Sequence, residues 1–341
     1  MISDESVGSG SGDDALPSSI NAAARGYLQR VASRPRIDWP RPSESNAWSA
    51  LQARLDRDMA AFYRQRNAGF AEENVRHPGV PSDVWEIRSA TRAGLFSAID
   101  PAMLYVHGGA YVMGGGQLAA EAAREWAHAL GDTATVYAVD YRLPPEHVFP
   151  AALDDVVAAL SWVMSRHARS PVAAVGVSAG GGLLASALLK RRDLGLPVPA
   201  AAVFLMPECD LTESGDSFEV LREADVVLKG SLMNANRLYA GGADLAHPYL
   251  SAIYGDVRGA FPPSLLISGT RDLFLSNTVR LHRLLRRAGV AADLVVHEAM
   301  PHGGFPGSPE NDEMLADIVG FLEHALRSKD GGPVRDSARP E

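Results

Sequence analysis

The chain has 341 residues, and its 32 Lys and Arg against 41 Asp and Glu give a formal net charge of −9. Hydrophobic residues make up 46% and charged residues 21%, a balance typical of globular proteins with a large core. Net acidity argues against a nucleic-acid partner, which requires a basic face. The single cysteine, Cys209, excludes an internal disulfide and a cysteine-based zinc site.

The two ends of the chain differ in composition from the middle. Residues 1–16 and the tail 327–341 are rich in small and polar residues, which predicts disorder around a single domain over residues 17–326. The start is acidic and polar, so we expect no signal peptide and a cytoplasmic protein. Residues 172–189 reach the lower limit of a membrane span, but three consecutive glycines interrupt them. We therefore expect a buried strand, turn and helix there, and no membrane association.

The first part of the chain predicts two helices before any clear strand. Ser18 and Ser19 can cap a helix over residues 20–32. A second helix is expected over residues 46–66, where apolar residues recur at spacings of three and four and so share one face. That face carries Trp48, Leu51, Leu55, Met59 and Phe62.

From residue 84 onward, short apolar runs alternate with helical patterns. The predicted strands cover residues 84–89, 103–106, 135–141, 172–177, 202–206, 264–268 and 293–297. The predicted helices cover residues 119–130, 152–167, 183–192, 278–288 and 311–326. This alternation predicts an α/β fold with a mostly parallel sheet covered by helices on both faces. Because ligands bind at the carboxyl ends of such strands, functional residues are expected directly after them.

A strand–turn–helix pattern surrounds Ser178. The predicted strand 172–177 leads into the run GVSAG over residues 176–180, which fits G-x-S-x-G. A serine on so sharp a turn needs small neighbours, and its hydroxyl then projects beside the positive end of the following helix. A glycine-rich turn with an incidental serine is the alternative, but the strand and helix around it favour a nucleophile.

Glycines also follow the predicted strand 103–106, in the run HGGAY over residues 107–111. Glycine lets a backbone approach closely and aim its N–H groups at a developing oxyanion. The N–H groups of Gly108 and Gly109, with that of Ala179, are therefore candidates for an oxyanion hole. A plain tight turn is the alternative, which the serine further along the chain disfavours.

A serine nucleophile needs a base, and the base needs an acid that orients it. One known order along α/β sheets is serine, acid, histidine. Asp272 follows the predicted strand 264–268, and His302 follows the predicted strand 293–297. We predict that these two residues are the acid and the base.

Other carboxylates and histidines compete for these roles. Glu208 and Asp210 follow strand 202–206, one strand before the expected acid, and are interpreted as polar bracing. As a pair they would also allow glycoside hydrolysis, which nothing else in the sequence supports. His297 ends a strand and comes too early for the loop that should carry the base.

Taken together, these motifs resemble the microbial esterase branch of the hormone-sensitive-lipase family of α/β hydrolases. The resemblance spans roughly residues 80–326 and includes DYRLPPEH at 140–147 and FPAA at 149–152 besides the runs above. It implies a helical cap from about residues 17–75 and 208–250. It also implies a possible homodimer paired through the last strand, and no metal or organic cofactor.

Three positions depart from the family pattern. Val177 stands where the family usually has Asp, Ala110 replaces the third glycine of the oxyanion motif, and Leu273-Phe274 replaces Pro-Leu after the acid. Since an alanine N–H still donates, we expect the oxyanion hole to survive. Residues 207–218 resemble a subgroup whose members are often labelled lactone hydrolases.

The resemblance implies a serine carboxylesterase that acts on a small-molecule substrate through an acyl-enzyme. We expect short- to medium-chain esters or lactones, with a pocket lined by Tyr111, Val177, Phe218 and Phe305. Two alternatives stay open. An amidase or deacetylase would use the same three residues, and some proteins of this fold that have lost the histidine are small-molecule receptors.

Overall fold

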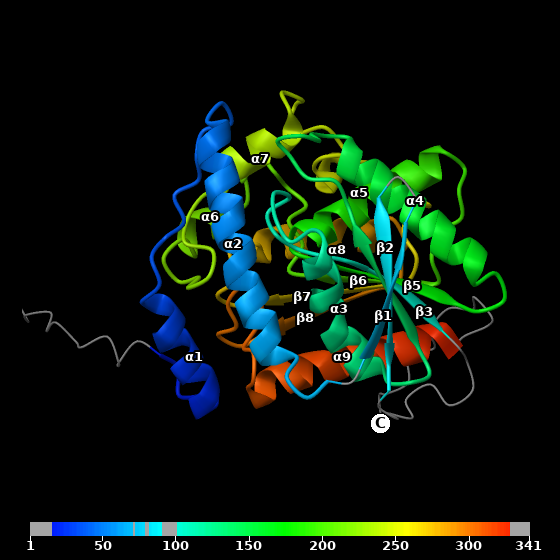
Figure 1. Ribbon diagram of the computed structural model, residues 1–341, viewed down its shortest axis with the longest axis horizontal. Coiled ribbons are helices and arrows are strands. Elements are labelled where there is room, and N and C mark those ends of the chain that lie inside the picture. Colours follow the sequence, from blue (N-terminus) through cyan, green and yellow to red (C-terminus); the bar gives the residue numbers. More distant parts are fainter. Residues whose placement is uncertain (1–15, 71, 79–81, 91–100, 328–341) are drawn as a thin grey trace, which may run out of the picture.

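The computed structural model describes residues 16–70, 72–78, 82–90 and 101–327, and its centre is an eight-stranded sheet (Figure 1). The strand order is β1-β2-β4-β3-β5-β6-β7-β8. The strands are β1 Glu72–His77, β2 Asp83–Ser89, β3 Ala102–Val106, β4 Thr135–Asp140, β5 Val172–Val177, β6 Ala201–Leu205, β7 Ser264–Gly269 and β8 Ala292–His297. The pairs β1–β2 and β2–β4 are antiparallel, and the other pairs are parallel. The mostly parallel α/β sheet is therefore confirmed.

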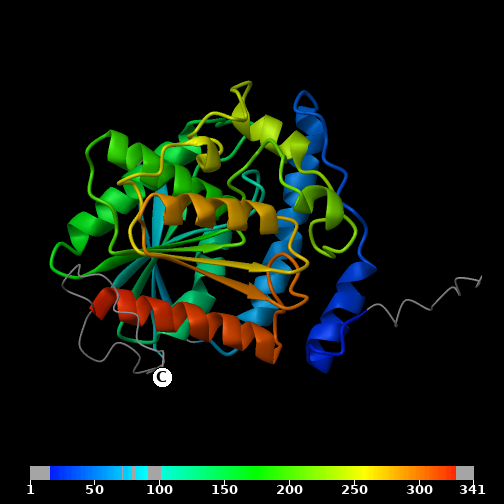
Figure 2. The same ribbon diagram turned by 180° about the vertical axis from the view of Figure 1, so that it is seen from behind.

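Helices cover both faces of this sheet (Figures 1 and 2). On one face lie α4 Ala151–Arg166, α5 Ala179–Asp193 and α8 Leu275–Arg287. On the other lie α3 Gln117–Leu130 and α9 Pro309–Arg327, and α1 Ala22–Ala32 joins the same core cluster from beyond the ends of the strands (Figure 2). Alternate residues of β3 enter the two cores: Leu104 packs on the first side, and Met103 and Tyr105 pack on the second. This period of two explains why the central strands are apolar throughout.

A third cluster joins segments that are far apart in the sequence. It combines Trp48 and Leu51 of α2 Ser45–Arg66 with residues of the 208–250 insertion between β6 and the short helix η1 Ala252–Tyr254. The insertion contains α6 Ser217–Val220 and α7 Met233–Ala240. Figure 1 shows α2, α6 and α7 on the same side of the molecule. The cluster also includes Ala110 and Phe274, from loops that follow β3 and β7.

Several boundaries differ from the sequence-based expectation. Strand β1 was not predicted because it contains one apolar residue, Val75, which is 51% exposed at the sheet edge. It also places residues 72–75 in the sheet rather than in the expected cap. Helix α1 is capped by Asn21, whose side chain accepts the N–H of Ala23 at 2.8 Å, so Ser18 and Ser19 do not cap it.

Helix α5 begins at Ala179, four residues earlier than expected, because its glycines serve close packing. A Cβ added to Gly182 would fall within 3.0 Å of the Glu208 carbonyl oxygen. The predicted disordered ends lie outside the described residues, apart from Leu16 and Arg327, the last residue of α9. In the described part of the chain, every helix is too short or too polar to cross a membrane.

Candidate active site

Ser178 occupies a strained turn between β5 and α5. Its φ of 56° and ψ of −123° are unusual for a residue with a side chain. Small neighbours permit the turn, since a Cβ on Gly176 would fall within 3.0 Å of the Gly180 backbone. Hydrogen bonds to the neighbouring strand β6 and its following loop hold the turn: the Ser178 N–H donates to Leu205 O at 2.9 Å, and the Ser178 carbonyl accepts the Glu208 N–H at 3.0 Å.

The three residues predicted as nucleophile, acid and base meet at the carboxyl ends of β5, β7 and β8. Ser178 Oγ lies 2.9 Å from His302 Nε2, and His302 Nδ1 lies 2.9 Å from Asp272 Oδ1. Since a carboxylate only accepts, Nδ1 carries the proton and Nε2 is free to accept the serine hydroxyl. Asp272 is fully buried, whereas Ser178 is 9% and His302 7% exposed.

The Asp272 carboxylate is held by two further donors. Ser268 Oγ donates to Oδ2 at 2.6 Å, and the Phe274 N–H donates to Oδ1 at 3.0 Å. Phe274 also packs edge-on against the His302 ring, with centroids 4.8 Å apart. Acid and base therefore have little freedom to rotate away from each other.

His302 is a stronger base than an ordinary histidine. Burial lowers the pKa of its imidazole. The hydrogen bond to Asp272 and the charges of Asp272 and Asp225 raise the pKa by more than burial lowers it. The net effect is a raised pKa. A base of this kind can take a proton from a serine hydroxyl when the serine attacks.

The loop after β3 passes directly over Ser178. A Cβ on Gly108 would lie 3.1 Å from Ser178 Cβ, and Gly109 adopts a φ of +126°. Ala179 is the first residue of α5, where helix N–H groups have no partner within the helix. Within the described ranges, the N–H groups of Gly108, Gly109 and Ala179 have no acceptor, so they are free to donate hydrogen bonds to a substrate oxygen.

His107 supports this loop from within the core. Burial lowers the pKa of His107 to about 4, so its ring is neutral near pH 7. Its Nδ1 donates to Gly108 O at 2.7 Å, and the ring stacks on Tyr141 with centroids 4.0 Å apart. The Tyr141 hydroxyl donates to His107 O at 3.0 Å. The tyrosine of the run DYRLPPEH is thus one support of the loop that carries the predicted oxyanion-hole N–H groups.

Known proteins of similar sequence and structure share this architecture. The profile of the alpha/beta hydrolase fold family matches residues 103–306, more than half of the chain. A solved esterase described as a member of the bacterial hormone-sensitive lipase family is 31% identical, with a TM-score of 0.74 over 89% of this chain and 97% of that one. The chain belongs to the hormone-sensitive-lipase branch of the alpha/beta hydrolases. The sequence resemblance is therefore confirmed.

Other relatives of this hydrolase are esterases and acetyl-hydrolases. The solved esterase E25 has a TM-score of 0.81 and 31% identity over 91% of this chain and 96% of that one. The acetyl-hydrolase of Streptomyces hygroscopicus is 37% identical over 65% of this chain and 75% of its own length. The ethyl acetate hydrolase of Pseudomonas putida is 31% identical over 66% of this chain and 73% of its own length.

Helix α2 of the hydrolase braces the loop that follows β3, a contact that the sequence analysis did not foresee. Gln52 Nε2 donates to Val112 O at 2.6 Å and to Pro144 O at 2.8 Å. Asp56 Oδ1 accepts the Gly114 N–H at 3.2 Å. These side chains lie one turn apart on a helix with many polar residues, so no sequence signal distinguishes them.

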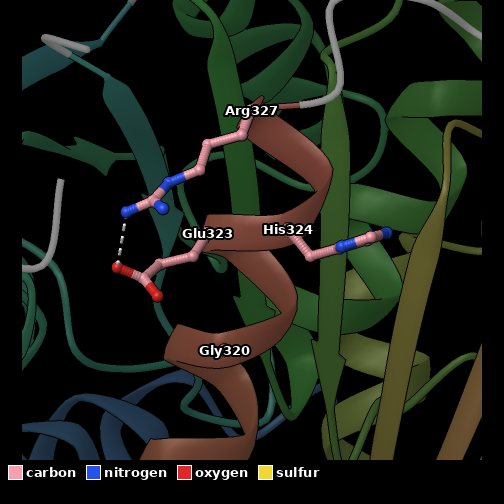
Figure 3. Close-up of a pocket in the computed structure, with 4 residues that line it drawn as sticks. All are labelled: Gly320, Glu323, His324 and Arg327. Carbon is pink, nitrogen blue, oxygen red and sulfur yellow. Dashed lines mark hydrogen bonds and ion pairs between the residues drawn. The ribbon is translucent and has the colours of Figure 1, made fainter. Parts of the chain in front are cut away.

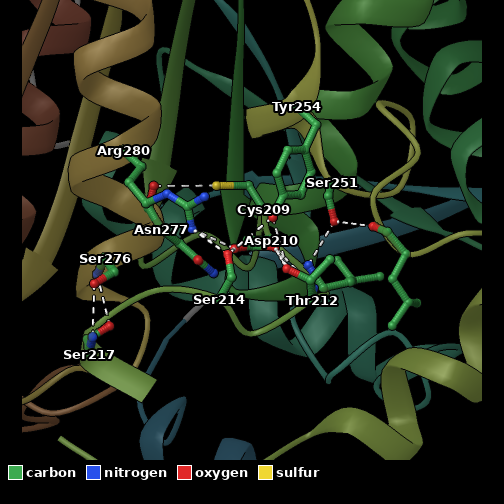
Figure 4. Close-up of polar contacts among 12 residues, drawn as sticks. Cys209, Asp210, Thr212, Ser214, Ser217, Ser251, Tyr254, Ser276, Asn277 and Arg280 are labelled. Carbon is green, nitrogen blue, oxygen red and sulfur yellow. Dashed lines mark hydrogen bonds and ion pairs between the residues drawn. The ribbon is translucent and has the colours of Figure 1, made fainter. Parts of the chain in front are cut away.

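The expected polar bracing is found for the Asp210 carboxylate, whereas Glu208 braces the turn through its backbone N–H alone. Asp210 is fully buried. Its carboxylate accepts hydrogen bonds from the Arg280 guanidinium of α8 at 2.6 Å and from the hydroxyl groups of Thr212 at 2.6 Å and Ser214 at 2.8 Å (Figure 4). Glu208 holds the nucleophile turn through its N–H, and burial, followed by the charge of Glu213, raises the pKa of its carboxyl to about 8.

The residues predicted to line a pocket lie in different core clusters. Tyr111 is 1% exposed, and its hydroxyl donates to Glu208 O at 2.5 Å. Phe218 packs on Phe274 with ring centroids 5.7 Å apart, in the cluster that includes α2 and the insertion. Tyr111 and Phe218 thus contact different neighbours.

The other two predicted pocket residues lie on the α9 side of the sheet. Phe305 is fully buried and packs edge-on against Tyr27 at 6.1 Å, and Val177 borders the same cluster. The four residues thus belong to three core clusters, and their contact with substrate stays a prediction.

A shallow depression on α9 carries none of this chemistry. It has a volume of about 350 Å³ and is lined by Gly320, Glu323, His324 and Arg327 (Figure 3). Glu323 and Arg327 form an ion pair at 3.4 Å along the helix. The depression lies toward the C-terminal end of α9, whereas the His302 loop precedes the N-terminal end.

Proposed function

We propose that this hydrolase is a serine carboxylesterase with Ser178 as nucleophile, His302 as base and Asp272 as acid. The observation that carries the proposal is the continuous chain of two 2.9 Å contacts from Ser178 through His302 to Asp272. In such an arrangement the histidine takes the serine proton as the serine oxygen attacks the ester carbonyl. Asp272 then stabilises the imidazolium that forms.

The oxyanion of the tetrahedral intermediate would be stabilised by the N–H groups of Gly108, Gly109 and Ala179. They border Ser178 and are fixed by a folded loop and a helix terminus, so little reorganisation is needed during reaction. His302 then protonates the leaving alcohol, and an acyl group stays bonded to Ser178. A water molecule, activated by the same histidine, releases the acid and restores the serine.

We propose short acyl esters as the preferred substrates. Relatives named acetyl-hydrolase and ethyl acetate hydrolase support a short acyl group. We also propose that α1, α2 and the 208–250 insertion form a cap. The shared cluster of α2, the insertion and the loop that carries Phe274 supports this role, because it packs beside His302.

Hydrolysis of p-nitrophenyl esters from acetate to dodecanoate tests the proposal, with Ser178→Ala as the control. We expect the highest kcat/KM at two to four carbons and loss of turnover in the variant. A matched p-nitroacetanilide assay and a pH-stat assay with simple lactones separate esterase, amidase and lactonase activity. Absence of ester hydrolysis by folded wild-type protein would reject the carboxylesterase.

A further inference from the structure

Asp225 is a buried carboxylate that the mechanism above does not use. It lies in the 208–250 insertion, between α6 and α7, and is 1% exposed. Its Oδ1 accepts the N–H groups of Val227 at 2.9 Å and Leu228 at 3.1 Å. Its Oδ2 accepts the N–H groups of Leu273 at 2.8 Å and His302 at 3.4 Å.

These four donors come from three segments of the chain. Val227 and Leu228 belong to the insertion, Leu273 directly follows the acid, and His302 is the base. Hydrogen bonds to an ionised acceptor are roughly twice as strong as neutral ones. A single carboxylate therefore ties the insertion to both loops that carry the acid and the base.

The charge of Asp225 also changes the pKa of neighbouring side chains. Burial raises the pKa of Asp225 to about 6, while the charge of His302 lowers it and the charge of Asp272 raises it. Asp225 is therefore ionised at pH 7 and above. The titratable groups that face it are Asp272, His302 and Tyr27 of α1. Burial raises the pKa of Tyr27, and the charge of Asp225 adds to this, so the phenol stays neutral. His302 therefore has two carboxylates beside it.

We propose that Asp225 is a positioning residue that holds the acid and base loops together and whose negative charge stabilises the imidazolium form of His302. The inference rests on the proposed function, because that function makes His302 the base. Asp225 touches no reacting atom; it acts through His302 and Leu273.

The variant Asp225→Asn tests the role of the charge. Its amide oxygen can still accept from Val227 and Leu228, but the NH2 group cannot accept from Leu273 and His302, and the charge beside His302 is lost. Loss of a nearby opposite charge lowers the pKa of an imidazole by about one unit. We therefore expect the acid limb of the kcat/KM profile to move to lower pH by about one unit. At pH values above this limb, kcat should fall about tenfold, because one pKa unit of lost imidazolium stabilisation corresponds to a factor of ten in rate.

Ser217→Ala is the matched control for a purely structural role. Ser217 Oγ accepts the Ser276 N–H at 3.0 Å (Figure 4). It also donates to Leu273 O at 2.7 Å, so it joins the insertion to the acid loop without a charge. We expect this variant to lose stability and some turnover while its acid limb stays at the wild-type pH. An equal shift of the limb in both variants would overturn the electrostatic role of Asp225.

NMR titration of ¹³C-labelled histidine provides a readout that does not need activity. In a Ser178→Ala background, we expect the His302 imidazole to titrate at lower pH when Asp225→Asn is added. If wild-type protein hydrolyses esters but neither readout shifts, this inference fails and the proposed function stands. If wild-type protein hydrolyses no ester, the proposed function fails, and the titration still decides whether Asp225 acts on His302.

Asp225→Glu keeps the charge but displaces the carboxylate oxygens. This variant tests the positioning role, also in the case that the asparagine variant does not fold. We expect a kcat about tenfold below wild type with an unchanged acid limb, because the displaced oxygens no longer hold the N–H groups of Leu273 and His302 in place. Wild-type kcat in this variant would overturn the positioning role.

Discussion

The Glu208 N–H donates to the Ser178 carbonyl oxygen at 3.0 Å, so the segment that follows β6 holds the turn at Ser178 in place. The Glu208 side chain is 1% exposed, and its raised pKa of about 8 keeps it protonated at pH 7. The site therefore combines Asp225, which is ionised at pH 7, with a neutral carboxyl behind the Ser178 turn.

Glu208→Gln should change the pH dependence of stability. A carboxyl with a raised pKa in the folded state gives its full contribution below the unfolded value of 4.5, and this contribution is lost as pH rises toward 8. Glutamine does not ionise, so the variant should gain about 3 kcal/mol in unfolding free energy relative to wild type between pH 4.5 and pH 7. Urea unfolding at both pH values measures this, with the exposed Glu73→Gln as the control. Parallel changes in wild type and Glu208→Gln would contradict the prediction.

Gly109→Ala should disable the oxyanion loop. Its φ of +126° disfavours a side chain, and a Cβ would fall within 3.0 Å of Met113 O. The loop must shift, and loss of one oxyanion donor lowers kcat on the order of 10²–10³-fold. Gly195→Ala is the control, because Gly195 has a φ of +68° but open space around it. Steady-state kinetics should show near wild-type kcat for the control; equal kcat values in the two variants would count against this view of the loop.

The acid limb of the pH–rate profile should lie above the ordinary histidine pKa of 6.5. Only neutral His302 accepts the serine proton, so activity falls as pH drops through its raised pKa. In Asp272→Asn, the main contribution that raises this pKa is gone, so we expect the limb to move to lower pH and kcat to fall by about 10⁴. Profiles of kcat/KM from pH 4.5 to 9 measure both effects. A limb below pH 6 in wild-type protein is incompatible with the geometry.

Tyr141→Phe should separate the hydroxyl of Tyr141 from its ring. The ring still stacks on His107, but the buried carbonyl of His107 loses its donor. An unsatisfied buried acceptor costs about 1–3 kcal/mol, so the thermal midpoint should fall. We expect a lower kcat with little change in KM, since the hydroxyl supports the loop rather than the substrate. Unchanged kcat and unchanged stability would show that the hydrogen bond has no role.

Patterns along the chain were enough to predict the central sheet, the turn at Ser178 and the order of Ser178, Asp272 and His302. Buried strands between helices leave long apolar runs, and a sharp turn beside a helix requires glycines. The edge strand β1 was missed because an exposed edge needs no apolar run, and the start of α5 was misplaced because its glycines suggest a turn.

The sequence by itself determined which chemical groups are present and at which strand ends they lie, because those features depend on neighbouring residues. Only the tertiary structure decided which distant groups support them. Gln52 reaches Val112 across 60 positions, and Asp225 reaches Leu273 and His302 across 48 and 77. Such contacts form only when the helices and the insertion pack together, and a single polar residue on a helix or in a loop carries no local sign of its partner.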